Sequence, residues 1–307
     1  MTSNFPTGLQ VERFSTNPLI TPATSPTLGD NINGPSVICV PNWLPNPLGK
    51  YYMYFAHHAG TYIRLAYADD LRGPWNIYKP GTLHLNDAEA FQGHIASPDV
   101  HVDDDARQIR MYFHGVAKTR PGQWTGVATS KDGIHFSAST ELLGKFYFRV
   151  WPWQGRWYAL AKNNNEGWGE LYRASNPHGP FELRGNFLQG MRHAAVLVDG
   201  YNLCIFYSRV GDAPERILMA TVDMRGDWQT WQPTEPVEVL RPSEEYEGVQ
   251  YAVAPSGHGS ALGVQQLRDP FVMVNEEGWL MFYTGAGEAA ICGAEVACVQ
   301  LDDSQIA

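Results

Sequence analysis

Apolar and polar residues alternate along this chain in short runs, and the runs recur in five similar units. In the first unit Ile63, Leu65 and Tyr67 share one face and Arg64 and Ala66 share the other, which is the two-residue period of a β-strand. Each unit also contains an aromatic-rich apolar run, at 51–55, 110–114, 157–160, 203–207 and 279–283. Repeats of about 40–60 residues with several strands each are typical of a β-propeller.

The sequence therefore predicts an all-β fold, a five-bladed β-propeller that forms a single domain over residues 1–307. The blades are expected at about 31–80, 94–140, 145–185, 190–235 and 264–300. The last unit ends before a fourth strand, so residues 9–14 are expected to supply that strand and close the ring. A β-sandwich of similar short strands is the alternative, but it does not explain five recurrences of the same internal order.

Charge and hydropathy narrow the range of partners. The chain has 22 lysines and arginines against 32 aspartates and glutamates, and its basic residues are not clustered, which argues against nucleic acid. No run approaches the roughly 18 apolar residues that would span a membrane. The first residues lack the features of a secretion signal, which favours a cytoplasmic protein, although a secreted chain trimmed of its signal would look the same. The sequence does not indicate the oligomeric state.

Three units begin with a proline, and aligning these prolines brings two aspartates into register. Pro35, Pro98 and Pro270 coincide, with Asp269 directly before one proline and Asp99 directly after another. Positions two apart share a face of a strand. Asp99 and Asp269 are therefore both expected to face the central funnel, although an aspartate before a proline also commonly caps a turn.

The two units without this proline are aligned by counting back from their glycine turns. This count places Phe148 and His193 level with Asp269, and it places three arginines beside them, Arg149, Arg192 and Arg268. Carboxylates, a histidine and arginines in one cleft could hydrolyse a glycosidic bond, since one acid protonates the leaving oxygen while a second group activates water or attacks the sugar. A histidine that faces inward could instead be hydrogen-bonded within the core.

Loops between the strands supply the remaining candidate residues. Glu247 lies in a long loop rich in glycine, proline and serine, and it is the first choice of general acid, with His193 as the alternative. Glu215 is a second possible acid, or else part of a surface ion network with its neighbouring arginines. Substrate contacts are expected from six residues, Asn33, His94, Arg149, Trp168, Glu215 and Arg268.

No cofactor is expected. The ten histidines and four cysteines follow no metal-binding spacing, so a divalent cation would bind only if histidines converge in the funnel. The chain also lacks a phosphate-binding glycine loop, a nucleophile elbow and a dinucleotide fingerprint.

The segment Arg268-Asp269-Pro270, followed by a glycine and the aromatic strand at 279–285, resembles the five-bladed propeller glycosidases of glycoside hydrolase families 43, 32, 62 and 117. The endings at 67–69 and 73–75 are similar to family 43 blades. The resemblance implies a funnel-shaped active site with three acidic residues that acts on glycosides, with inversion in family 43. It also implies an aspartate at the start of the first blade, where this chain has Asn33.

This departure leaves several readings open. Either Asp99 or Asp269 serves as the catalytic base in place of the missing aspartate, or the protein does not hydrolyse glycosides by the usual mechanism of the family. In family 117 a histidine is implicated as the acid, and His193 or His94 could take that part here. The predicted function is a glycoside hydrolase acting on a carbohydrate. The alternatives are a non-catalytic carbohydrate-binding propeller, and a lyase or metal-assisted hydrolase that uses the histidines.

Overall fold

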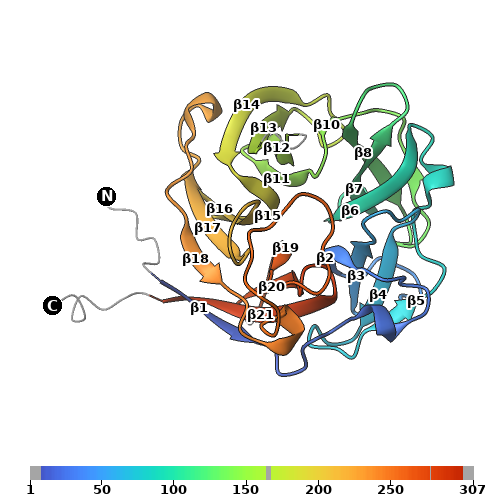
Figure 1. Ribbon diagram of the computed structural model, residues 1–307. Coiled ribbons are helices and arrows are strands. Elements are labelled where there is room, and N and C mark those ends of the chain that lie inside the picture. The colour runs from blue at the N-terminus through green and yellow to red at the C-terminus, as the bar shows by residue number, and fades with distance from the viewer. Residues whose placement is uncertain (1–7, 164–166, 277, 300–307) are drawn as a thin grey trace.

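Five antiparallel sheets stand around one axis in the computed structural model, which describes residues 8–163, 167–276 and 278–299 (Figure 1). The first blade contains β2 (Asn33–Cys39), β3 (Tyr51–Ala56), β4 (Arg64–Ala68) and β5 (Asn76–Tyr78). The second contains β6 (Phe91–Asp103), β7 (Gln108–Ala117), β8 (Gln123–Ser130) and β10 (Gly144–Lys145), with β9 (Ser137–Ala138) also paired to β8. The third contains β11 (Arg149–Trp153), β12 (Arg156–Lys162), β13 (Trp168–Ala174) and β14 (Glu182–Gln189).

The last two blades complete the ring. The fourth contains β15 (Met191–Asp199), β16 (Asn202–Arg209), β17 (Ile217–Asp223) and β18 (Val237–Leu240). The fifth contains β19 (Arg268–Asn275), β20 (Gly278–Gly285) and β21 (Ala290–Val299), and its outer strand is β1 (Gly8–Arg13) from the other end of the chain. β1 pairs antiparallel with β21, from Gly8 opposite Val299 to Arg13 opposite Ala294. The five-bladed fold and its closure by the N-terminal strand are confirmed.

The second strand of each blade is apolar on both faces because a neighbouring blade covers each face. In β3, Tyr52 and Tyr54 pack in a cluster with residues of the second blade, whereas Met53 and Phe55 pack in another with residues of the fifth. All four side chains are buried. This arrangement explains the continuous aromatic-rich runs, since burying each large apolar side chain stabilises the fold by about 1.5–3 kcal/mol.

The innermost strands are irregular where they begin at the axis. The pairing register shifts between Asn33 and Ser36 in β2, between Ala96 and Asp99 in β6, and between Arg268 and Phe271 in β19. At these shifts Gly34, Ser97 and Asp269 have left-handed φ values of 61°, 50° and 49°. A bulge of this kind redirects a side chain, and it occurs often beside active sites.

Hairpin registers identify the equivalent position in the other two blades. Arg149 pairs with Leu160 in the third blade as Phe271 pairs with Phe282 in the fifth, so Tyr147 corresponds to Asp269. Tyr147 also has a left-handed φ, of 75°. The expected alignment of Phe148 with Asp269 is therefore wrong by one residue. His193 does occupy the equivalent position in the fourth blade, as the sequence predicted.

Helical structure within the described ranges is limited to four three-residue 3-10 turns, η1 (Pro22–Thr24), η2 (Leu85–Asp87), η3 (Trp228–Thr230) and η4 (Glu245–Glu247). No helix in this part of the chain has the length and apolar character needed to cross a membrane. The site is therefore built entirely on strand ends and loops.

Candidate active site

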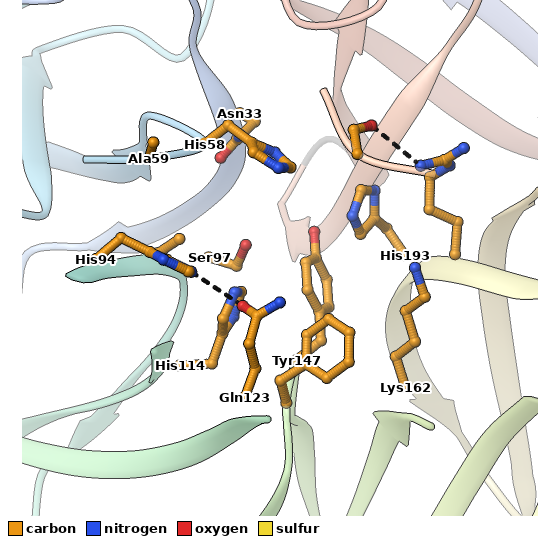
Figure 2. Close-up of a pocket in the computed structure, with 14 residues that line it drawn as sticks. Asn33, His58, Ala59, His94, Ser97, His114, Gln123, Tyr147, Lys162 and His193 are labelled. Carbon is orange, nitrogen blue, oxygen red and sulfur yellow. Dashed lines mark hydrogen bonds between the residues drawn. The ribbon is translucent and has the colours of Figure 1, made fainter. Parts of the chain in front are cut away.

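A cavity of about 240 Å³ is lined mainly by residues at the bulged beginnings of the inner strands and the ends of the second strands (Figure 2). The first blade contributes Asn33 and His58, and the second contributes four polar side chains, His94, Ser97, His114 and Gln123. The third and fourth blades contribute Phe146, Tyr147, Lys162, Arg192 and His193, and the loop before β19 contributes Gly259. Residues distant in sequence thus converge on one cavity.

His193 forms the chemically most distinctive contact of this cavity. Its Nδ1 lies 2.7 Å from Asp269 Oδ1, and its ring stacks on Tyr147 with centroids 4.3 Å apart. Asp269, only 1% exposed, also accepts a hydrogen bond from the Tyr147 hydroxyl and one of 3.2 Å from Thr284 Oγ1. With the proton of the neutral ring on Nδ1, beside the Asp269 carboxylate, His193 Nε2 is left as the nitrogen that can accept a proton.

Burial and charge set the protonation of this pair. Burial lowers the pKa of His193 to about 3, although the neighbouring Asp269 opposes the change. For Asp269, burial acts to raise the pKa, but the charge and hydrogen bond of His193, the Tyr147 hydroxyl and Arg268 together lower it. The pair therefore consists of a neutral histidine and an ionised carboxylate at neutral pH, which suits a base held in place by a carboxylate.

His58 lines the cavity from the first blade, and its pKa is shifted in the opposite direction to that of His193. Its Nδ1 lies 3.6 Å from Glu288 Oε1, and the interaction with this carboxylate raises the pKa of His58. Glu288 also accepts a 3.1 Å hydrogen bond from Asn33 Nδ2, and Arg268 Nη1 lies 3.5 Å from it. The cavity thus holds two histidine–carboxylate pairs whose surroundings shift the histidine pKa values apart.

The second blade contributes a further pair of histidines. His94 Nε2 lies 3.0 Å from Gln123 Oε1, and burial lowers the pKa of His94 (Figure 2). Burial also lowers the pKa of His114, whose Nδ1 has no hydrogen-bond partner within the described ranges. These neutral rings, together with Ser97, offer hydrogen-bonding groups of the kind that contact sugar hydroxyls.

Behind the cavity wall lies a buried ion network. Glu215 is 0% exposed, with Arg192 Nε 2.7 Å and Arg268 Nε 3.2 Å from its carboxylate oxygens. Burial raises the pKa of Glu215, and the two arginines oppose that shift. The alternative of a surface ion network around Glu215 is therefore wrong. Neither Glu215 nor Arg268 lines the cavity, but Arg192, which they hold, does.

Lys162 enters the cavity from the end of β12. Its side chain is directed toward His193 (Figure 2), and the residue is only 6% exposed. Within the described ranges no carboxylate lies within salt-bridge distance of its Nζ, which lies 5.6 Å from the centroid of Phe146. Burial lowers the pKa of Lys162 to about 8. Lys162 is therefore a buried ammonium without a bonded counter-ion.

Asp99 does not share this cavity, which corrects the expectation that the two proline-flanked aspartates meet. Asp99 lines a separate pocket of about 160 Å³ together with Arg149. Its Oδ2 accepts a 2.8 Å hydrogen bond from the Val150 N–H and lies 2.9 Å from His101 Nε2. Burial acts to raise the pKa of Asp99, but His101 and Arg149 lower it. The bulge before Asp99 breaks the two-residue alternation on which the expectation depended.

Glu247 is also outside the cavity. Both of its carboxylate oxygens bind Arg13 of β1, at 2.8 and 2.9 Å, and Tyr283 donates a 2.6 Å hydrogen bond to it. Its Oε2 further accepts the Ser243 N–H at 2.7 Å. A carboxylate that is 0% exposed and bonded on both oxygens has no access to a substrate. The expectation that Glu247 is the general acid is corrected by this position.

Two further predicted contact residues lie away from the cavity. Arg149 packs 4.6 Å from the Tyr147 ring centroid and donates to the carbonyl oxygens of Ala194 and Pro98. Trp168 is half-buried at the start of β13 and is not part of the lining. Its sequence neighbours at 164–166 lie outside the described residues. Of the predicted site residues, the structure brings Asn33, His94 and His193 to the cavity, with Asp269 directly behind.

Tyr147, Lys162 and His58 are functional candidates that were not predicted from the sequence. Aligning the blades by the pairing register of their first two strands could have identified Tyr147 and Lys162. Lys162 N–H bonds the Phe146 carbonyl, just as His114 and Thr284 pair with the residues that precede the bulge in their blades. Aligning the ends of the second strands therefore identifies a second ring of side chains around the axis. No comparable signal marks His58, which follows β3 in a loop.

Among the described residues, the lining contains no aspartate or glutamate side chain. Its titratable groups are histidines, a tyrosine, a lysine and an arginine, and the carboxylates stand one layer behind. Within the described ranges no group of three or more histidine, cysteine, aspartate or glutamate side chains is arranged to hold a metal. The arrangement can transfer protons through histidine and can bind polar or negatively charged groups.

Solved structures share this fold. A glycosyl hydrolase from Bacteroides ovatus is 12% identical with a TM-score of 0.65, covering 97% of this chain and 95% of its own. An alpha-L-arabinofuranosidase from Lactobacillus brevis is 13% identical with a TM-score of 0.61, covering 94% of each chain. A thermostable family-43 glycoside hydrolase is 13% identical with a TM-score of 0.60, and the alignment covers 89% of this chain and 91% of that protein. The resemblance to the five-bladed propeller glycosidases is thus confirmed at the level of the fold.

Sequence comparison gives a relative at higher identity. No family model matches the chain. The uncharacterized protein R118 of Acanthamoeba polyphaga mimivirus is 35% identical over 322 residues, which cover 94% of this chain and 90% of the viral protein. Similarity of this extent, over nearly the whole of both chains, shows that the two proteins are members of one family. The chain therefore belongs to the same family as the mimivirus protein R118.

Proposed function

We propose that this protein is a glycosidase that cleaves a glycosidic bond of a carbohydrate bound in the axial cavity. The observation that carries the proposal is the contact of 2.7 Å between His193 Nδ1 and Asp269 Oδ1 at the cavity wall. The fold supports it, because neighbours in structure include an alpha-L-arabinofuranosidase and a GH43 beta-xylosidase/alpha-arabinofuranosidase in complex with xylotriose. Both of those proteins act on carbohydrates.

In the proposed reaction His193 is the general base and His58 is the general acid. His193 Nε2 takes a proton from a water molecule, whose oxygen attacks the anomeric carbon as the bond to the leaving oxygen breaks. His58 gives its proton to that oxygen. Bulk water then restores both histidines. Groups whose pKa values are shifted apart are suited to these two tasks. A single displacement of this kind inverts the anomeric configuration.

Asp269 and Glu288 act through these histidines. Asp269 fixes the ring orientation and tautomer of His193 and stabilises the positive charge that develops when the base takes its proton. Glu288 favours the protonated form of His58. Tyr147 supports His193 by stacking and holds the Asp269 carboxylate through its hydroxyl.

A panel of nitrophenyl glycosides and plant or algal oligosaccharides tests the proposal, with the released sugar measured for wild-type protein and the His193→Gln variant. His135→Gln is a matched control, because His135 also pairs with an aspartate but lies on the surface. Turnover that is lost in His193→Gln and kept in His135→Gln supports the proposal. Equal turnover in all three proteins rejects it, and sugar binding without any turnover indicates a carbohydrate-binding propeller instead.

In the described part of the chain the lining holds Lys162 and Arg192 but no carboxylate, which favours one further reaction class, β-elimination from an acidic sugar. A base would remove the proton next to the sugar carboxylate, an unsaturated bond would form, and the glycosidic oxygen would leave with a proton from His58. Elimination consumes no water and yields an unsaturated sugar, whereas hydrolysis yields two saturated sugars. Ultraviolet absorbance and mass spectrometry of the products decide between the two.

A further inference from the structure

We infer that the sugar bound in the axial cavity carries a carboxylate, as a uronic acid does, and that Lys162 pairs with it. The inference rests on the proposed function, because it names the substrate class of the same cavity. The property that leads to it is the charge of the lining. Lys162 and Arg192 carry positive charge there, and no aspartate or glutamate side chain within residues 8–163, 167–276 and 278–299 lines the cavity.

Lys162 is the group available to an acidic ligand. It is 6% exposed and lies at the end of β12, with its side chain directed into the cavity (Figure 2). Lysines are almost never buried to this degree without a partner, because removing an ammonium from water is costly. Within the described ranges Lys162 Nζ lies over the Phe146 ring, 5.6 Å from its centroid, and no carboxylate lies within salt-bridge distance. A ligand carboxylate would supply the missing counter-ion.

Arg192 plays a different part. Its Nε contacts Glu215 at 2.7 Å, and its Nη atoms donate to the carbonyl oxygens of Gly257 and Gly259. These contacts occupy the guanidinium, and its charge is only partly offset because Glu215 also pairs with Arg268. Arg192 therefore adds positive potential to the wall but has little capacity for a new bidentate pair. This leaves Lys162 as the cation that selects an anion.

The other carboxylates near Lys162 do not substitute for a ligand. Asp269 is held by His193 and Tyr147, and Glu215 by Arg192 and Arg268. Both raise the affinity of Lys162 for its proton at longer range, but burial outweighs them. Lys162 is thus poised to gain a direct partner when a substrate enters.

The kind of anion follows from the number of free donors. Phosphate groups are usually bound by several cations or by successive backbone N–H groups at a helix N-terminus or a nest. The described part of this chain has only three-residue 3-10 turns, and the cavity offers one uncommitted ammonium. One positive charge matches one negative charge, as in a sugar carboxylate. Asn33, Ser97 and Gln123 remain to contact neutral hydroxyls.

Isothermal titration calorimetry with matched sugars tests the inference. Oligosaccharides of galacturonic and glucuronic acid are compared with the corresponding galactose and glucose oligosaccharides, for wild type, Lys162→Met, Lys162→Arg and Lys118→Met. Lys118 is an exposed lysine that is not part of the lining and serves as the control. Wild type and Lys118→Met should bind an acidic member at least about 10-fold more tightly than its neutral counterpart, with the preference declining as salt is raised.

Lys162→Met should bring the affinity for the acidic sugar down to that of the neutral one, and Lys162→Arg should restore part of the difference. Equal affinities in wild type, a preference that survives Lys162→Met, or binding of neither class overturns the inference. Tighter binding of a sulfated sugar than of the uronic acid overturns the carboxylate assignment. Since calorimetry needs no turnover, an acidic preference without bond cleavage rejects only the proposed function.

Discussion

His193 and Asp269 occupy equivalent positions in neighbouring blades, each at the bulged start of its innermost strand, and their side chains meet at 2.7 Å. The same backbone position thus supplies both members of a histidine–carboxylate pair. The contact forms between blades, so the geometry of the ring sets the distance between the two groups. This relationship makes the pair sensitive to substitutions that leave the blades intact.

Removing the proposed base should abolish most of the turnover. His193→Gln and Asp269→Asn should each reduce kcat by about 10²–10⁴-fold, because a positioned acid–base group typically contributes that much. The double variant should lose little more than either single variant, since the two residues act as one unit. Steady-state kinetics on the hit from the sugar panel provide the measurement, with thermal unfolding as the check on folding. Additive losses would show that Asp269 acts independently of His193.

The pH profile of kcat/KM should be bell-shaped. The acidic limb reports His193, which must be unprotonated as a base, so activity falls as pH drops toward a pKa of about 3. The alkaline limb reports His58, which must be protonated as an acid and whose pKa is raised by Glu288. Activity therefore falls as pH rises through that raised pKa.

Glu288→Gln tests the alkaline limb directly. Removing the Glu288 charge lowers the pKa of His58, so this limb should move to lower pH while the acidic limb stays in place. Glu170→Gln is the matched control, because Glu170 is a buried carboxylate that bonds Tyr172 away from the cavity. An alkaline limb that does not move in Glu288→Gln removes His58 from the acid role.

Glu247 should matter for stability rather than for turnover. Glu247→Gln leaves Arg13 without its bidentate partner and should reduce the free energy of unfolding by about 3 kcal/mol. Because Arg13 lies on the ring-closing strand β1, the loss weakens the closure of the fifth blade. Chemical denaturation measures the change, and kinetics below the unfolding temperature should show wild-type kcat. A large loss of kcat in a folded Glu247→Gln protein would restore Glu247 as a catalytic candidate.

Asn33→Asp should destabilise the protein in a pH-dependent way. Asn33 Nδ2 donates to Glu288 Oε2 at 3.1 Å, and an aspartate there would replace this bond by two adjacent carboxylates. Like charges at that distance cannot both ionise without cost, so the penalty should be about 3 kcal/mol at pH 8 and smaller at pH 5, where one group keeps a proton. Urea unfolding at the two pH values measures it. A penalty independent of pH would indicate a steric cause.

Turnover should be insensitive to metal chelators. One ring nitrogen of each of His58, His94 and His193 contacts a protein partner, and the described ranges contain no metal-binding group of three or more His, Cys, Asp or Glu side chains. Dialysis against EDTA should therefore leave kcat unchanged. A loss that a divalent cation restores would favour the metal-assisted alternative.

The sequence predicted the blades well because each blade repeats a strong local pattern. The aromatic-rich second strands, such as β3, are buried on both faces and stand out in any reading of hydropathy. The proline alignment also brought Asp269 to the bulged start of β19, directly behind the cavity wall, and the glycine count brought His193 to the equivalent position in β15. These signals depend on residues close together in the chain.

The rest of the site could not be predicted because it depends on backbone irregularities. The bulge at Ala96–Asp99 reverses the face expected for Asp99, and a one-residue slip in the third blade puts Tyr147 in place of Phe148. Glu247 and Glu215 are both inward carboxylates in loops, and only three-dimensional contacts show that arginines neutralise them. In loops the apolar and polar residues do not alternate regularly, so the sequence does not indicate whether a side chain such as that of Glu247 points into the cavity or away from it.

The bulged strand starts give this fold a way to change its chemistry. Gly34, Ser97, Tyr147, His193 and Asp269 hold corresponding sites around the axis, and each lies outside the apolar layers between blades. A substitution at one of these positions changes the reactive groups around the axis and leaves the packing of the blades unaffected. A propeller can therefore acquire a new reaction through a few replacements at the inner strand starts near the axis, while the packing of its blades stays the same.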